Sequence, residues 1–240
     1  LVPGAASLAA PLRLQSRNDE MEAALQARVD AADVPGLVAM AGTDHSVIYQ
    51  GAFGVRSVGA RTSMSADTVF SIASMTKLLT SVAALQLVER GRIKLDEPAA
   101  RLDPELASPQ VLDGFDARGT PQLRAARKPI TLRHLLTHTS GLSYQLWDTN
   151  VVRYGKVARN DPALPRAPLM FDPDARWAYG GSLDRVGRLV EITSGQNLDR
   201  YFHDHILGPL GMKDTSFVLT EAQHARRASL HLRKADGTLA

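Results

Sequence analysis

The sequence predicts a chain of mixed α/β (α+β) class. A helical pattern near the N-terminus precedes two short runs rich in strand-forming residues, and further helical patterns follow at about 74–90, 182–194 and 197–207. The chain has 240 residues, 44% of them hydrophobic, which suffices for a sizeable core in one or two domains.

The N-terminal segments predict a helix followed by a hairpin. Residues 1–14, rich in alanine and proline, are expected to be a flexible end, and an amphipathic helix is predicted from Asn18 to Ala32. Two strands follow at 36–41 and 46–50, because strand-forming residues there flank a short polar turn.

A long helix is predicted from about Ser74 to Arg90. It should end at Gly91, because glycine suits the residue that follows a helix. One apolar stripe is expected to form its buried face: Leu78, Leu79, Val82, Leu85 and Val88. Burial of that stripe would hold the first turn of the helix in place.

The remaining segments alternate between irregular and helical patterns. Residues 96–130 are expected to be a surface excursion, and the proline-rich residues 148–176 a long loop. A helix is predicted over 182–194, with Ser182 as its N-cap and a glycine just past its end. One more helix is predicted over 197–207.

Ser74 and Lys77 form the first candidate catalytic pair. Residues three apart on a helix share a face, about 5–6 Å apart at Cβ. The lysine can accept the serine proton if its pKa falls by roughly three units from about 10.4, and partial burial and the helix N-terminus both lower it. The alternative is an exposed lysine beside a capping serine.

Tyr179 is the second candidate. It stands just before a predicted helix and is followed by Gly180 and Gly181, which allow close approach of the backbone. A phenol held near a lysine can relay protons to a leaving group when its pKa is lowered from about 10. The alternative is a core tyrosine with a satisfied hydroxyl.

Other motifs and the composition exclude several classes. His134 and His138 lie four apart, but Leu135 stands where a zinc protease needs glutamate, so no metal site is predicted. No G-x-S-x-G elbow and no phosphate-binding glycine loop occurs. The absence of cysteine excludes disulfides and thiolate chemistry and leaves a cytoplasmic or periplasmic location open. With a net charge of +3 and no long apolar run, neither nucleic acid nor a membrane is an expected partner.

Four motifs in a fixed order carry a family resemblance. They are Ser74–Lys77, His134–Leu142, Trp177–Gly181 and Leu207–Lys213. Together they resemble the serine β-lactamase-related family, specifically the class C β-lactamases and family VIII carboxylesterases, over about residues 19–218. The second and fourth motifs are structural loops near the site in that family, so His134 and His138 are not assigned catalytic roles.

The resemblance implies a penicillin-binding-protein-like fold, with an antiparallel sheet flanked by helices and a helical subdomain. Residues 1–92 would form the N-terminal part of the α/β domain with the nucleophile helix. Residues 93–220 would form a mainly helical subdomain, and 221–240 would begin the return to the α/β domain.

The same resemblance implies the catalytic roles. Ser74 would be the acylated nucleophile, Lys77 its base partner, and Tyr179 the residue that moves the proton to the leaving group and activates water. Class C β-lactamases carry Tyr-x-Asn at this motif, whereas Gly181 stands at the third position here, which favours an esterase. Four residues are predicted to bind substrate, with packing as the alternative for the first two: Tyr144, Trp147, Gly180 and Gly181.

Family members are longer than this chain. The part without a counterpart here holds the remaining strands of the sheet and a third motif, which supplies one oxyanion-hole N–H. The Ser74 N–H would supply the other, and loss of one donor typically costs about 10²–10³ in rate. The chain is therefore expected to be a fragment or truncated form that needs a missing C-terminal segment or a homo-oligomer.

The predicted function is that of a serine hydrolase that forms an acyl-enzyme, most simply a carboxylesterase acting on small-acyl esters. No metal or organic cofactor is expected. The alternatives are a β-lactamase or D-alanyl peptidase, which use the same chemistry, and a non-catalytic binding member of the same fold.

Overall fold

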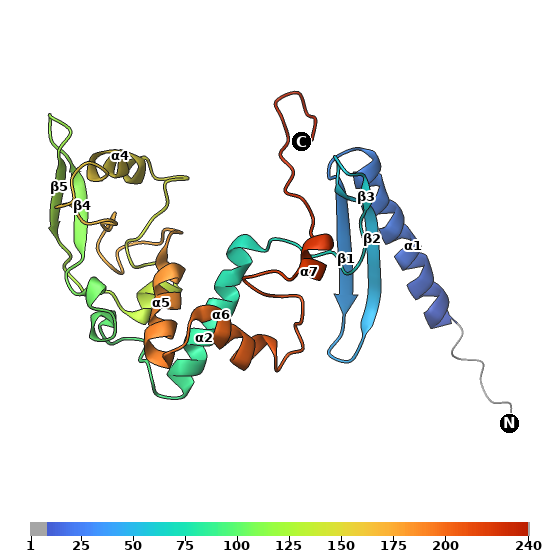
Figure 1. Cartoon of the computed structure of the whole chain (residues 1–240), viewed down its shortest axis with the longest axis horizontal. Coiled ribbons are helices and arrows are strands. Elements are labelled where there is room, and N and C mark those ends of the chain that lie inside the picture. The colour runs from blue at the N-terminus through green and yellow to red at the C-terminus, as the bar shows by residue number, and fades with distance from the viewer. Residues whose placement is uncertain (1–8, 240) are drawn as a thin grey trace. The chain divides into compact units, whose positions relative to one another are not determined.

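The computed structural model describes the backbone of residues 9–239 and the side chains of residues 18–239. The chain forms two compact units (Figure 1). The sheet unit comprises the residues up to Ser71 and those from Val218 onward, and the helical unit comprises Ile72–Phe217. The predicted domain boundaries at residues 92 and 220 stay a prediction. The helix after Ser74 belongs to the helical unit, whereas the predicted boundaries place it with the N-terminal part, residues 1–92.

The sheet unit begins with helix α1 (Ala9–Asp30), which starts well before the predicted Asn18. The flexible end expected over residues 1–14 is therefore wrong for residues 9–14, which are helical, and residues 1–8 lie outside the described residues. Strands β1 (Gly36–Gly42) and β2 (Val47–Ser57) pair antiparallel, as predicted, and short β3 (Thr62–Ser63) pairs with β2.

The C-terminal residues return to this unit. Helix α7 (Glu221–Ala225) leads into a segment whose Ala228 N–H donates to the Val69 carbonyl at 2.9 Å. Further along, the Arg233 guanidinium donates to the carbonyls of Ala32 and Asp33. Residues separated by two hundred positions thus belong to one compact unit.

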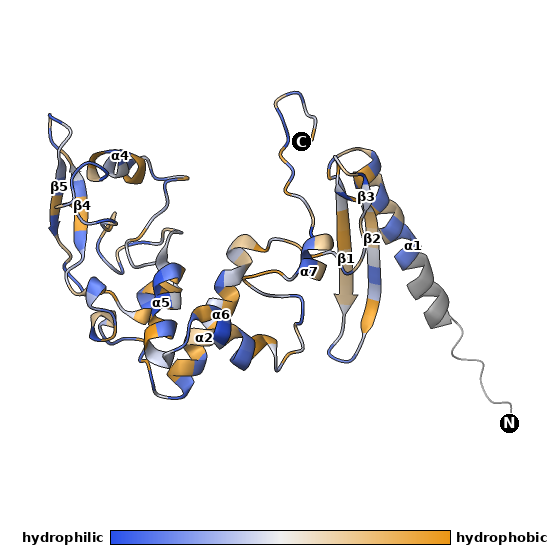
Figure 2. Ribbon diagram, in the orientation of Figure 1, coloured by the Kyte–Doolittle hydropathy of each residue, from blue (hydrophilic) through white to orange (hydrophobic). Residues whose placement is uncertain are grey.

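The core of the helical unit is built on α2 (Thr76–Glu89) and α5 (Ser182–Ser194), which pack against each other. Helix α6 (Leu198–Phe202) continues into a π-helical segment (His203–Leu207), in place of the single helix predicted over 197–207. Both α2 and α5 mix hydrophobic and hydrophilic residues along their length (Figure 2).

The predicted buried face of α2 is wrong. Leu78 is 70% exposed and Leu85 47% exposed, while Leu79 and Val88 are only partly buried. The buried face consists instead of small or medium side chains: Thr80, Ala83, Ala84 and Leu87. Small residues let the two helix backbones approach closely, and because α2 is apolar on most sides, periodicity alone selected the wrong face.

The predicted surface excursion over 96–130 contains regular structure. Strands β4 (Gln110–Phe115) and β5 (Pro121–Ala125) form a hairpin in which Val111 is buried. The sequence analysis missed this hairpin because the prolines and aspartates of residues 96–130 gave the whole region a loop-like composition.

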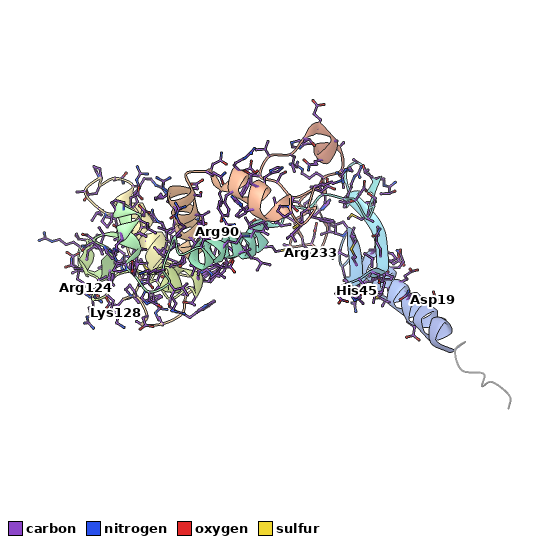
Figure 3. The ribbon with its side chains drawn as sticks, turned by 90° about the horizontal axis from the view of Figure 1, so that it is seen from below. Asp19, His45, Arg90, Arg124, Lys128 and Arg233 are labelled. Atoms are coloured by element: carbon purple, nitrogen blue, oxygen red, sulfur yellow. The ribbon has the colours of Figure 1, made fainter. Side chains whose placement is uncertain are left out.

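The Arg124 guanidinium of β5 makes two hydrogen bonds to the Asp172 carboxylate, and Lys128 pairs with Asp174 at 2.8 Å. The two basic residues lie in the same region of the unit (Figure 3). These pairs tie the hairpin and the segment after it to the loop that precedes Tyr179.

Two further helices complete the unit. Helix α3 (Leu132–Leu136) overlaps the start of the second motif, and α4 (Thr149–Ala158) occupies the start of the region predicted to be loop. Helix α4 was missed because the prolines that follow it gave the whole region a loop-like composition. None of the helices described between residues 9 and 239 is long and apolar enough to span a membrane.

Helix α5 has the predicted bounds, and Gly195 ends it in the left-handed conformation, with φ 74°. The N-cap, however, is Gly181 and not the predicted Ser182. Ser182 is fully buried, and its hydroxyl hydrogen-bonds to the equally buried Ser140 hydroxyl at 2.9 Å. This bond joins the second motif to the start of α5.

Candidate active site

Ser74 lies in a single 3₁₀ turn (Ala73–Met75) that leads directly into α2. Ser74 is exposed. The residue before it, Ala73, has φ 41°, a left-handed conformation that is costly for a non-glycine residue. Such a strained conformation persists only where the surrounding structure holds it in place, and strained residues are common at functional sites.

Lys77 occupies the first turn of α2, and its Nζ donates a hydrogen bond to Ser74 Oγ at 3.2 Å. The i, i+3 spacing therefore brings the two side chains together, as the sequence predicted. Thr80 on the next turn is buried, and its hydroxyl donates to the Thr76 carbonyl at 3.1 Å.

Tyr179 reaches the same point from the segment before α5. Its ring lies 4.9 Å from Lys77 Nζ, and its hydroxyl is hydrogen-bonded to Ser74 and Lys77. Residues a hundred positions apart in the sequence thus form one hydroxyl–amine–phenol group. Their catalytic roles remain a prediction at this point.

The charges in this group differ from the sequence expectation. Hydrogen bonds from Ser74 and Lys77 lower the pKa of Tyr179, although burial opposes the change. For Lys77, burial lowers the pKa, but the hydrogen bond to Tyr179 and the nearby Tyr144, Tyr179 and Asp184 raise it above its usual value overall. The expectation that the surroundings lower the pKa of Lys77 was therefore wrong, because it took no account of the phenol.

Asp184 is a site residue that the sequence analysis missed. It lies in the first turn of α5, and its charge raises the pKa of both Lys77 and Tyr179. Its position five residues after the tyrosine, at a predicted helix start, was the available signal. That signal is weak, because the helix dipole favours acidic residues in the first turn of any helix.

An aromatic cluster surrounds Tyr179. The rings of Tyr144 and Trp147 lie 5.8 and 5.5 Å from the Tyr179 ring, and Trp147 Nε1 donates to the Tyr179 carbonyl at 3.0 Å. Trp147 is still 53% exposed, so one face of its ring is available to a ligand. The predicted substrate contacts of Tyr144 and Trp147 stay a prediction, and the hydrogen bond adds a packing role for the tryptophan.

The two glycines after Tyr179 differ. A Cβ on Gly180 would lie 2.5 Å from the Leu142 carbonyl oxygen, so only glycine fits against the second motif. A Cβ on Gly181 would meet the Asp184 carboxylate at 3.3 Å and leave the backbone untouched. Their predicted part in substrate binding stays a prediction.

A cavity of about 460 Å³ lies between α2 and α5 beside these groups. This volume is within the usual range for small-molecule sites. Polar groups on its wall include Ser74, Lys77 and Asp184, while Leu183, Leu198 and Phe217 supply apolar surface.

The two histidines of the second motif have separate positions. His134 belongs to the capping box of α3, where Thr131 N–H donates to its Nδ1 at 3.3 Å. His138 packs against Tyr179, with ring centroids 4.7 Å apart. Among the described residues, no three His, Asp or Glu side chains gather as a metal-binding group.

The fold and the Ser–Lys–Tyr group together define a serine β-lactamase-like protein. A family model described as Beta-lactamase matches residues 21–240, and the chain belongs to this family. The predicted family and the predicted β-lactamase and penicillin-binding-protein-like fold are both confirmed.

Individual relatives are acyltransferases and esterases. The acyltransferase mokF of Monascus pilosus is 42% identical, with 92% of this chain and 57% of the relative covered. The lovastatin esterase of Penicillium rubens is 35% identical, over 90% of this chain and 57% of the relative. Among solved structures, a LovD6 mutant of simvastatin synthase from Aspergillus terreus matches with a TM-score of 0.84 at 41% identity, over 92% of this chain and 56% of that one. The chain thus spans just over half the length of these relatives.

Proposed function

We propose that this chain carries the nucleophile and the proton-transfer groups of a serine enzyme that moves acyl groups through an acyl-enzyme. The observation that carries the proposal is the meeting of Ser74, Lys77 and Tyr179 in one hydrogen-bonded group. A serine hydroxyl needs a partner that takes its proton, and the group offers one within direct contact.

Tyr179 is the proposed proton acceptor. Lys77 Nζ lies 3.2 Å from Ser74 Oγ, and a protonated lysine, which its raised pKa favours, can donate there but cannot accept the serine proton. The pKa of Lys77 is raised and that of Tyr179 is lowered, so the surroundings favour proton transfer from the phenol more than for a free tyrosine, with Lys77 keeping its own proton. In this arrangement Lys77 stabilises the charge on Tyr179, a different role from the base predicted from the sequence.

The proposed reaction has two halves. Ser74 Oγ attacks the acyl carbon while its proton passes to the Tyr179 oxygen, and the leaving alkoxide takes that proton as its bond to the acyl carbon breaks. In the second half a water or an alcohol gives its proton to Tyr179 and attacks the same carbon, which releases Ser74 Oγ. Ser74 then recovers its proton from Tyr179.

The proposed substrates are small acyl esters, with either water or an alcohol as acceptor. The relatives' names include both acyltransferases and an esterase, so both outcomes of the second half occur among similar proteins. The cavity beside Ser74 is of a size for a small acyl group, and the exposed face of Trp147 offers apolar surface to the rest of the ester.

The test is covalent labelling of Ser74. Intact mass spectrometry after treatment with a fluorophosphonate or p-nitrophenyl acetate should show one adduct, which is absent in Ser74→Ala. Ser81→Ala is a matched control, because Ser81 lies on the same helix and its hydroxyl only donates to the Lys77 carbonyl. An adduct that persists in Ser74→Ala, or none on folded protein supplied with the C-terminal region of a relative, would overturn the proposal.

A second measurement separates the acceptors. p-Nitrophenyl butyrate turnover in increasing concentrations of a primary alcohol should yield the new ester in proportion to the alcohol if acyl transfer operates. Butyric acid as the sole product would identify a hydrolase. Rapid nitrocefin turnover would favour the β-lactamase alternative.

A further inference from the structure

His138 lies directly behind the proposed proton acceptor. It follows α3 in a left-handed backbone conformation, with φ 57°, which is uncommon for a residue with a side chain. In this conformation its carbonyl accepts the Ala178 N–H at 2.9 Å. The backbones of the second motif and of the Tyr179 segment are thus joined one residue before the phenol.

The imidazole ring of His138 packs on the Tyr179 ring. The two centroids are 4.7 Å apart and the planes are inclined at 43°, while Trp177 meets the imidazole edge-on at 6.2 Å. Aromatic pairs at such distances are stabilising beyond the area that they bury. His138 therefore touches the phenol and one of its aromatic neighbours.

Within residues 18–239, no hydrogen bond at Nδ1 accounts for the orientation of this imidazole. Its Nδ1 is buried and has no hydrogen-bond partner among the described residues. Buried polar atoms usually have a partner, and an exception calls for an explanation. The ring contacts with Tyr179 and Trp177 and the backbone hydrogen bond from Ala178 hold His138 in place. The imidazole therefore interacts with its surroundings mainly through the flat face of its ring.

We propose that His138 is a positioning residue for Tyr179, and that its imidazole supports the phenol so that the hydroxyl stays on Ser74 and Lys77. This inference rests on the proposed function for its activity measurement. Burial, and then the charge of Lys77, lower the pKa of His138, so the ring is neutral at neutral pH and adds no second positive charge beside the lysine.

The test compares three variants of the full chain: His138→Ala, His138→Phe and His134→Ala. Phenylalanine keeps a flat ring without a titratable nitrogen. His134→Ala is the matched control, because His134 caps α3 in the same motif and should affect stability alone. The first measurement is NMR titration of Tyr179 in ¹³C-tyrosine-labelled protein, with its signal assigned by Tyr179→Phe.

In His138→Ala we expect the pKa of Tyr179 to rise toward about 10, because a phenol that moves freely loses the hydrogen bonds that lower it. In His138→Phe and His134→Ala the pKa should stay lowered. An unchanged Tyr179 pKa in folded His138→Ala would overturn the inference, and this result does not depend on turnover.

The second measurement is the rate at which a fluorophosphonate acylates Ser74. We expect a loss of about tenfold to hundredfold in His138→Ala and recovery in His138→Phe, since small misplacements of a reacting group carry costs of this size. Equal losses in both variants would show that the nitrogen itself is needed, and would overturn a positioning role. If no variant and no parent protein is labelled, the proposed function fails, while the titration still decides the role of His138.

Discussion

Two neighbouring regions of the helical unit differ in what holds them. The nucleophile turn (Ala73–Lys77) is largely exposed, and polar hydrogen bonds connect its reactive side chains. The loop junction, formed by Ser140, Gly180 and Ser182, is buried and leaves no room for an added atom at Gly180. The reacting groups of the first region therefore depend on the second for the position of Tyr179.

This difference implies two kinds of response to mutation. Changes in the nucleophile turn should alter rates and leave stability nearly unchanged, because little surface is buried there. Changes in the loop junction should reduce stability and rate together, since the same backbone that is strained would also move Tyr179. The predictions below test this division, from the largest expected effect to the smallest.

Tyr179→Phe removes the proposed proton acceptor and keeps the ring. We expect the rate of Ser74 acylation by a fluorophosphonate to fall about 10²- to 10⁴-fold, the usual range for loss of a general acid–base group. Thermal unfolding should change little, because phenylalanine keeps the ring and its contacts with Tyr144 and Trp147. A rate within twofold of the parent protein would assign the proton transfer to Lys77 instead.

Gly180→Ala should break the loop junction. Its new methyl group would lie 2.5 Å from the Leu142 carbonyl oxygen and 2.7 Å from Ser143 Cα, and neither backbone atom can move cheaply. We expect a loss of about 1–3 kcal/mol in the free energy of unfolding, measured by urea denaturation, together with slower acylation.

Gly181→Ala is the control for that variant. Its methyl group would meet the end of the Asp184 side chain at 3.3 Å and the Tyr144 ring at 3.8 Å, both of them side-chain contacts, and Gly181 has an ordinary φ of −71°. We expect a change smaller than about 1 kcal/mol. Equal destabilisation in the two variants would contradict the view that the junction is close-packed at Gly180 alone.

The buried Ser140–Ser182 bond offers a finer test of the same junction. Ser140→Ala leaves the Ser182 hydroxyl unpaired and also removes the acceptor of the Leu142 N–H. We expect it to cost about 1–3 kcal/mol in the free energy of unfolding. Ser182→Ala should cost less, because Ser140 Oγ then keeps the Leu142 N–H.

A double-mutant cycle completes that test. Once Ser140 is alanine, the further change Ser182→Ala removes an unpaired buried hydroxyl and should cost little or nothing. Additive losses in urea denaturation would mean that the two hydroxyls do not interact.

The sequence predicted those features that depend on local chemistry. Helix α5 ends where predicted because a glycine follows it. Ser74 meets Lys77 because residues three positions apart in a helical turn lie on the same face. The family motifs also pointed to Tyr179. Local sequence patterns alone could not place this residue beside Ser74 and Lys77, about a hundred positions earlier in the chain.

Features that depend on distant partners were not predictable in this way. The buried face of α2 is set by α5, a hundred residues away, so the larger leucines were wrongly placed inside. The pKa direction of Lys77 depends on Tyr144, Tyr179 and Asp184, and these partners outweigh burial, one of the two effects that were expected to lower it. Ser182 was predicted to be a cap because serine is favoured at that position. Its actual partner, the buried Ser140, lies in another motif and could not be inferred from the local sequence.

Asp184→Asn should give the smallest effect, a shift in pH dependence without a change in fold. The Asp184 charge raises the pKa of both Tyr179 and Lys77, so its removal should lower both. At a given pH more Tyr179 is then phenolate, which moves the acid limb of the acylation rate to lower pH. Lys77 also loses its proton at lower pH, so the alkaline limb moves in the same direction.

The joint movement distinguishes an electrostatic effect from general damage. We expect both limbs to move by less than about one pH unit, with the maximal rate nearly kept, in fluorophosphonate acylation measured from pH 5 to 11. Glu191→Gln is a suitable control, because Glu191 lines the same cavity but is not among the charges that shift either pKa. Limbs that move apart, or a lower maximum at unchanged limbs, would show that Asp184 acts through structure and not through its charge.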